Sequence, residues 1–129
     1  MITREELNRI FEEVINNSRD VMFSKNREYS RDTNALDNFD TSSEEAGITP
    51  LQAWAVFFRK HLNSILTYVR EGKSYSNEDI SERITDCINY LVILQALIIR
   101  EKELNNKEPD NIRKNQVLLE KGIDNGSGK

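Results

Sequence analysis

The chain has 129 residues and a formal net charge of −4, with 37% apolar and 31% charged residues, which is typical of one soluble, helix-rich domain of modest size. No block of Lys and Arg residues stands out, so a duplex nucleic-acid partner is not expected. The longest apolar run, Tyr90 to Ile99, is too short to cross a bilayer and the chain does not open on a signal-peptide pattern, so we expect a cytoplasmic protein without a membrane partner.

A first helix is predicted from about residue 3 to residue 23. Thr3 and Glu6 have the spacing of a capping box, which satisfies the first free N–H groups of a helix. Its apolar side chains recur at steps of three and four, as in an amphipathic helix: Leu7, Ile10, Phe11, Val14 and Ile15. The glutamates of this helix lie mainly off that stripe, which indicates a solvated face; alternatively, some of them bind Mg²⁺.

Residues 24–48 predict a long, irregular connection, because they are rich in Asn, Asp and Ser, whose side chains compete for backbone hydrogen bonds. Loops of this length in compact domains are usually functional or disordered. Lys25 and Arg27 supply positive charge, while Tyr29 and Phe39 supply rings. That combination suits a nucleotide, and the alternative is a capping loop with incidental charges.

A second helix is predicted from Thr49, which can cap it, to Gly72, which can end it. Its apolar face has helical spacing: Leu51, Trp54, Ala55, Phe58, Leu62, Ile65, Leu66 and Val69. His61 falls on the same side. A histidine in such a place is usually a hydrogen-bonded core residue, and alternatively it donates to a phosphate or to a base edge.

The most apolar helix is predicted from about residue 77 to residue 105, with Pro109 breaking it. Asp86, Asn89 and Tyr90 lie inside its apolar segment, where polar groups need partners. The single Cys87 is interpreted as a small buried hydrophobe. We expect one helical domain over residues 1–120 and a disordered tail over residues 121–129.

These elements predict an all-α protein, an antiparallel bundle of three to four helices with a long loop between helices one and two. The third helix is apolar over more of its circumference than one small bundle can bury. The sequence therefore predicts a homo-oligomer.

Several catalytic patterns are absent from the sequence: a Ser-His-Asp order, a glycine-rich phosphate loop and a zinc spacing of Cys and His. Carboxylates remain as candidates for chemistry. Glu82 and Asp86 lie four residues apart on one helix, and the first helix offers Glu12 and Glu13. Carboxylates that converge across helices can bind Mg²⁺ and activate water, although acidic pairs at this spacing are common.

Four short motifs resemble those of small phage-encoded all-α proteins that are similar to the MazG-like and nucleotide-modification-associated helical domains: Lys25-Asn26-Arg27-Glu28-Tyr29, Asn38-Phe39, Lys60-His61 with Ser64-Ile65, and Arg83-Ile84-Thr85-Asp86-Cys87-Ile88-Asn89-Tyr90-Leu91. The likeness covers about residues 20–100. It implies Mg²⁺-dependent hydrolysis of nucleoside triphosphates, with ligands from Glu-Glu-x-x-Glu and Glu-x-x-Asp motifs. This chain has Asn16 and Arg83 where those motifs have Glu.

The resemblance and these two departures together lead us to expect a non-catalytic, phage-type protein without a cofactor. It would sequester a small linear or cyclic nucleotide immune signal in the host-cell cytoplasm, as some oligomeric helical phage proteins do. The expected ligand-binding residues are Lys25, Arg27, Tyr29, Asn38, Phe39, Lys60, His61, Asp86, Asn89 and Tyr90. Two alternatives stay open: a Mg²⁺-dependent MazG-like pyrophosphohydrolase with Glu82 and Asp86 as metal ligands, and a structural oligomer without a small ligand.

Overall fold

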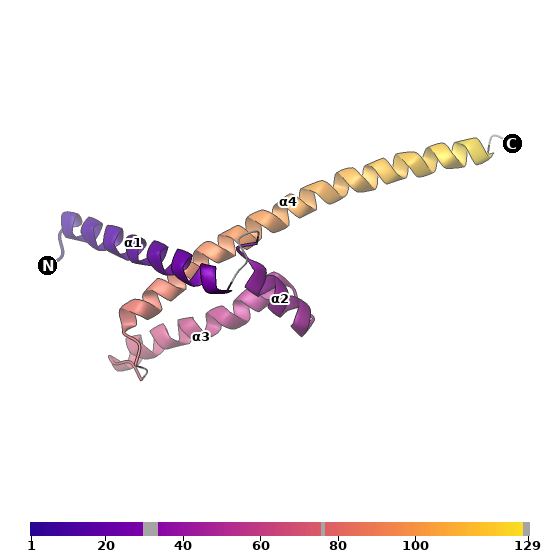
Figure 1. Ribbon diagram of the computed structural model, residues 1–129. Helices are drawn as coiled ribbons and strands as arrows, with labels where there is room; N and C mark the ends of the chain where they lie inside the picture. The colour runs from indigo at the N-terminus through magenta and orange to yellow at the C-terminus, as the bar shows by residue number, and fades with distance from the viewer. Residues whose placement is uncertain (30–33, 76, 128–129) are drawn as a thin grey trace. The chain divides into compact units, whose positions relative to one another are not determined.

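The computed structural model describes residues 1–29, 34–75 and 77–127, and the side chains of residues 1–24, 34–75 and 77–107. Its described part contains four helices and no strand (Figure 1): α1 (Arg4–Tyr29), α2 (Asp37–Ala46), α3 (Pro50–Glu71) and α4 (Ile80–Ser127). The all-α prediction is confirmed. The arrangement as an antiparallel bundle stays a prediction.

Three helix ends that the sequence marks are present: the start of α1, the start of α3 and the end of α3. At the start of α1, the Glu6 N–H donates to Thr3 Oγ1 at 3.1 Å and the Thr3 N–H donates to Glu6 Oε2 at 2.8 Å. Thr49 and Gln52 form the same capping box at the start of α3, where Pro50 is the first helical residue. Gly72 ends α3 with a φ of 71°, a left-handed conformation that favours glycine.

The predicted long loop between helices one and two is wrong, because α1 runs on to Tyr29 and α2 occupies much of the remaining segment. The polar residues that argued for a loop instead support a helix start. Asn34 Oδ1 accepts from the Leu36 N–H at 3.0 Å, and Asn34 Nδ2 donates to Asp40 Oδ2 at 2.9 Å. Gly47, with a φ of 67°, ends α2. Asn34 thus orders the turn before α2, whose N-cap residue Leu36 makes no side-chain capping bond.

The expected break at Pro109 is also wrong, since α4 continues to Ser127. A proline inside a helix removes one hydrogen bond and costs about 3 kcal/mol. The residues on both sides include many good helix formers, such as Glu, Lys, Leu and Gln. The limits of the predicted domain and tail stay a prediction.

The chain divides into two compact units, residues Met1–Leu97 and Ile98–Lys129, and the contacts between helices described below lie in the first. Among the described residues, the buried apolar side chains are few: Phe39, Ala53, Cys87 and Leu97. The burial of Cys87 confirms its interpretation as a small core residue.

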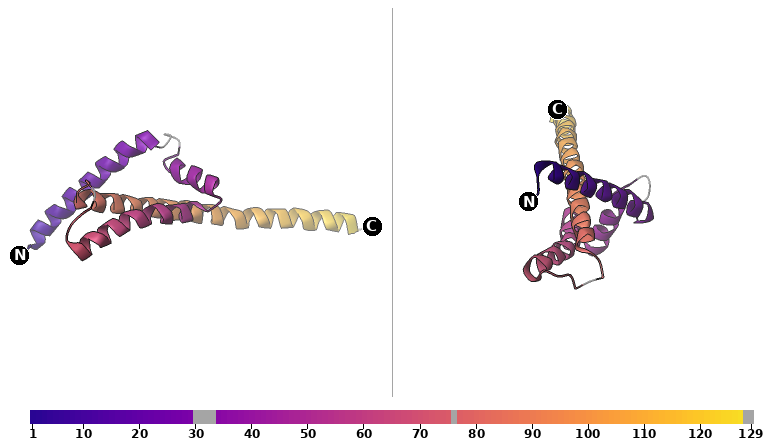
Figure 2. Two further views of the ribbon diagram at one scale, coloured as in Figure 1. Left: turned by 90° about the horizontal axis from the view of Figure 1, so that it is seen from below. Right: turned by 90° about the vertical axis from the view of Figure 1, so that its left-hand side faces the viewer.

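Helix α3 and the first part of α4 pack side by side in opposite directions (Figure 2). The Trp54 indole N–H donates to the main-chain oxygen of Tyr90 at 2.6 Å, and His61 Nδ1 lies 3.6 Å from Asp86 Oδ2. Residue numbers therefore rise along α3 as they fall along α4. Helix α2 packs beside this pair through Phe39. This corner, where three helices meet, positions the candidate site.

Candidate functional site

Four side chains gather where α2, α3 and α4 meet, and we name them the Tyr90 cluster: Phe39, His61, Asp86 and Tyr90. The His61 and Tyr90 rings lie with their centroids 4.7 Å apart at an interplanar angle of 35°. Phe39 meets Tyr90 edge to face at 6.2 Å. Phe39 is buried, whereas the other three side chains are half-buried and therefore keep contact with solvent.

Aromatic side chains of α3 hold this cluster in place. Trp54 and Phe58 stack with centroids 4.7 Å apart, and Phe58 also lies 6.3 Å from the Tyr90 ring. Phe39 meets Phe57 edge to face at 5.9 Å. Aromatic pairs of this kind contribute about 0.5–1.5 kcal/mol each beyond their burial. These α3 rings fix the backbone of α4 at Tyr90 and so orient the Tyr90 side chain.

Charged groups border the cluster on α4. Arg83 Nε lies 3.1 Å from Glu78 Oε2, and Asp86 Oδ2 lies 3.6 Å from His61 Nδ1. The second distance is longer than a hydrogen bond, so Asp86 acts on His61 chiefly through its charge. The cluster therefore combines one carboxylate, one imidazole and one phenol within a single helix crossing.

Burial sets the protonation of these groups. It lowers the pKa of His61; the Asp86 carboxylate opposes this effect, while Arg83 and Lys60 reinforce it. Burial and the charge of Asp86 raise the pKa of Tyr90, and the same two causes raise the pKa of Cys87. At neutral pH the cluster thus presents a neutral imidazole and a neutral phenol beside a carboxylate.

The structure brings together only some of the side chains expected at the site. Lys60 is exposed on α3, and its charge acts on His61. Asn38 is exposed beside the buried Phe39, and Asn89 is buried next to Tyr90 in the chain. The side chains of the remaining three, Lys25, Arg27 and Tyr29, fall outside the described residues.

The two proposed metal ligands differ in their surroundings. Glu82 is exposed, while Asp86 faces His61. Among the side chains that the structure describes, no group of three or more His, Cys, Asp and Glu residues is placed to hold a metal ion. The assignment of Glu82 and Asp86 to Mg²⁺ stays a prediction.

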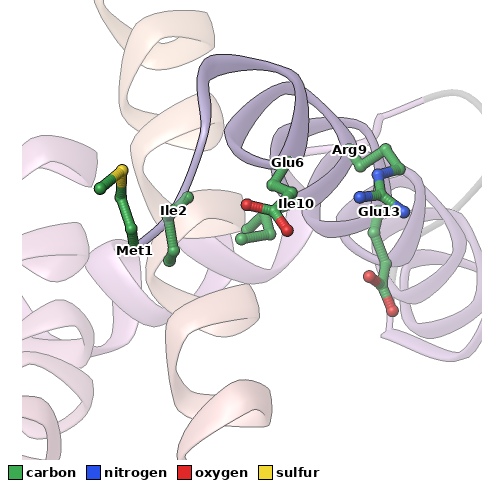
Figure 3. Close-up of a pocket in the computed structure, with 6 residues that line it drawn as sticks. All are labelled: Met1, Ile2, Glu6, Arg9, Ile10 and Glu13. Carbon is green, nitrogen blue, oxygen red and sulfur yellow. The ribbon is translucent and has the colours of Figure 1, made fainter.

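A concave surface lies at the start of α1 (Figure 3). It is a shallow depression of about 350 Å³, and its lining comes from one short stretch of chain: Met1, Ile2, Glu6, Arg9, Ile10 and Glu13. It mixes apolar and charged side chains, and it includes Glu13, one of the first-helix carboxylates that the sequence offered for Mg²⁺.

Reading the sequence missed the part played by Trp54, Phe58 and Arg83. The two rings were assigned to the core, although their spacing of four residues places them on one turn of the helix face that also carries His61. Arg83 was noted only as a departure from a metal motif. Its electrostatic effect on His61 depends on the packing of two helices, which the sequence does not encode locally.

Comparison of the chain with protein-family models, with curated proteins and with solved structures found no match. Over the residues that the structure describes, no helix combines the length and the apolar character needed to span a membrane.

Proposed function

We propose that this chain binds a small nucleotide at the Tyr90 cluster without converting it. The observation that carries the proposal is the convergence of Phe39, His61, Asp86 and Tyr90 from three helices on one partly solvated spot. All four are among the residues that the sequence predicts to contact a nucleotide. Their proximity supports the assignment.

Each group has a chemical role in this proposal. The Tyr90 ring offers a face or an edge for a base, and stacking of this kind contributes about 1–3 kcal/mol per base. Asp86 accepts hydrogen bonds from amino and ring N–H groups on a base edge. Lys60, exposed close to His61, meets the phosphate, with Lys25 and Arg27 expected to add further positive charge.

Calorimetry of the full chain against linear and cyclic nucleotides tests the proposal. Lys60→Ala should weaken binding about tenfold, the equivalent of one phosphate contact. Lys102→Ala, which removes an exposed lysine from the second unit, is the matched control and should leave affinity unchanged. Tyr90→Phe keeps the ring and deletes only the hydroxyl, so it tests whether stacking alone accounts for the contribution of Tyr90 to binding. If no nucleotide binds, or if both lysine variants bind equally well, the proposal is wrong.

Turnover is a distinct outcome of the same experiment. Release of pyrophosphate from a nucleoside triphosphate with Mg²⁺ would replace the non-catalytic proposal by the pyrophosphohydrolase alternative. The assay should include Asp86→Asn, because that change removes the carboxylate charge and keeps the size of the side chain.

A structural homo-oligomer is the second candidate, and one observation favours it. Among the described residues, eighteen large apolar side chains are exposed, while only four apolar side chains are buried. Soluble monomers rarely expose apolar surface on this scale in contiguous patches. Measurement of the mass in solution tests this candidate, and a monomeric chain would contradict it.

A further inference from the structure

Helices α3 and α4 each carry an exposed apolar stripe beside their mutual contact. On α3 the stripe consists of Leu62, Leu66 and Val69, and on α4 it consists of Ile84 and Leu91. Leu66 is 47% exposed and Leu91 is 52% exposed. The steps of three, four and seven residues keep each set on one side of its helix.

The two stripes lie on the same side of the helix pair. Leu62 follows His61 by one residue, and Leu91 follows Tyr90 by one residue; His61 and Tyr90 are in contact across the pair. Seen from one end, two antiparallel right-handed helices turn in opposite senses as each chain advances. The residue that follows the contact residue therefore lies on the same side of the pair in both helices. We call this surface the α3–α4 face: Leu62, Leu66, Val69, Ile84 and Leu91.

Helix α2 leaves the α3–α4 face open. Its Phe39 contacts Phe57, which lies five residues before Leu62, about 140° around the helix axis. The outer edge of the face is basic, because Arg59 and Arg70 lie three residues before Leu62 and four residues after Leu66. An apolar surface with a basic edge calls for an apolar partner with an acidic edge.

The N-terminal half of α1 has that composition. Leu7, Ile10 and Phe11 form its exposed apolar stripe, with Leu7 59% and Phe11 60% exposed. Glu6 and Glu13 lie four residues before and three residues after Ile10, along one edge of this stripe, as Figure 3 shows for these three side chains. The stripe is apolar where the α3–α4 face is apolar. Arg9 lies along the same edge as the two glutamates, so this edge carries one net negative charge, opposite in sign to the edge that Arg59 and Arg70 form.

We propose that the α1 stripe of a second copy of this chain docks on the α3–α4 face, with Glu6 and Glu13 facing Arg59 and Arg70. Each chain of the dimer then contributes one α1 stripe and one α3–α4 face. The two identical contacts bury apolar surface from both chains. This inference rests on the self-association that is the second candidate above, and it names the surface responsible. It is independent of nucleotide binding, since the Tyr90 cluster lies at the crossing and not on the face.

Sedimentation equilibrium of the full chain provides the first test. We expect a particle of twice the 15.0 kDa chain mass. Leu66→Gln should raise the dissociation constant of the dimer at least about tenfold, because it places a polar group in the buried contact. Val56→Gln is the control, since Val56 is 66% exposed on α3 but lies off the stripe. Equal weakening by both variants, or by neither, would overturn the proposed surface.

Charge reversal provides the second test and identifies the occupant. Glu13→Arg and Arg59→Glu should each weaken association several-fold, and the chain that carries both should recover it, because the edges are again opposite in charge. Failure of the double variant to recover would show that α1 is not what covers the face. A monomeric wild-type chain would instead refute self-association as a whole, so the two failures are distinguishable.

Discussion

Trp54 is the residue that ties α3 to α4 most directly. Its indole N–H donates to the Tyr90 main-chain oxygen at 2.6 Å while its ring stacks on Phe58. The ring is therefore a spacer between two helices and a donor at the same time. A leucine at this position would fill less space and could not donate a hydrogen bond.

Trp54→Phe should lower the free energy of unfolding by about 1–2 kcal/mol, because it keeps most of the ring packing but deletes the donor. Urea unfolding monitored by circular dichroism measures this change. Tyr75→Phe, an exposed substitution on the loop after α3, is the control and should have no measurable effect. An unchanged midpoint for Trp54→Phe would mean that the short hydrogen bond contributes nothing to stability.

His61 makes stability depend on pH in a defined direction. Its pKa is lowered below 6.5 in the fold, mainly by burial, with Asp86 and Glu78 opposing and Arg83 and Lys60 adding to the effect. A proton therefore binds more tightly to the unfolded chain than to the folded one. The contribution of His61 to the free energy of unfolding is fully present above pH 6.5. It is lost as the pH falls through the unfolded-state pKa toward the lower pKa of the folded state.

His61→Gln should remove this part of the pH dependence. The unfolding free energy of the wild type relative to the variant should be constant well above pH 6.5 and should fall as the pH drops below it. Because His61 is the single histidine of the chain, no other imidazole contributes to this difference. A difference that stays constant over the whole window would show that His61 is as solvated in the fold as in the unfolded chain.

At the scale of elements, the same capping motif occurs in two settings. Thr3 and Glu6 cap α1, and Thr49 and Gln52 cap α3. The α3 start is followed closely by the buried Ala53, whereas the apolar residues of the first turns of α1 are exposed. Loss of the first cap should therefore fray a helix end, and loss of the second should weaken the packed corner.

Thr49→Ala should lower the global free energy of unfolding by about 1 kcal/mol. Thr3→Ala should leave global unfolding nearly unchanged and raise only the amide exchange rates in the first turn of α1. Hydrogen exchange combined with urea unfolding separates the two effects. Equal global losses would mean that the start of α1 unfolds together with the α3–α4 pair.

The sequence predicted helix type well and helix limits unevenly, for physical reasons. Capping boxes and left-handed glycines are local, so the two ends of α3 were predicted correctly. Helix α2 was missed because Asn34 and its neighbours favour a turn and a helix start equally well until a buried Phe39 decides between them. The continuation of α4 past Pro109 was missed because one strong breaker outweighed many weaker helix formers in the prediction.

Prediction of the site divides along similar lines. Phe39, His61, Asp86 and Tyr90 stood out as rings or polar groups at unusual places, and the structure places them together. The role of Trp54 in holding them depends on a hydrogen bond across thirty-six positions of the chain, which no local pattern encodes. The contribution of Lys25, Arg27 and Tyr29 stays a prediction.

At the scale of the whole molecule, apolar surface exceeds what the first unit buries within itself. If self-association covers this surface, folding and assembly are linked by mass action. The midpoint of thermal unfolding should then rise by roughly 4 °C for each tenfold increase in chain concentration. Differential scanning calorimetry over a hundred-fold range measures it, and a midpoint independent of concentration would indicate that the fold needs no partner copy.

The burial of Cys87 has a practical consequence. The thiol is the only one in the chain, it is buried next to Asp86, and one helical turn separates it from Tyr90. A thiol reagent can reach it only when this part of α4 separates from its neighbours. The rate at which Cys87 is labelled therefore reports how often the helices separate. A ligand or a partner that holds the helices together would slow the labelling, and no additional cysteine has to be introduced to measure it.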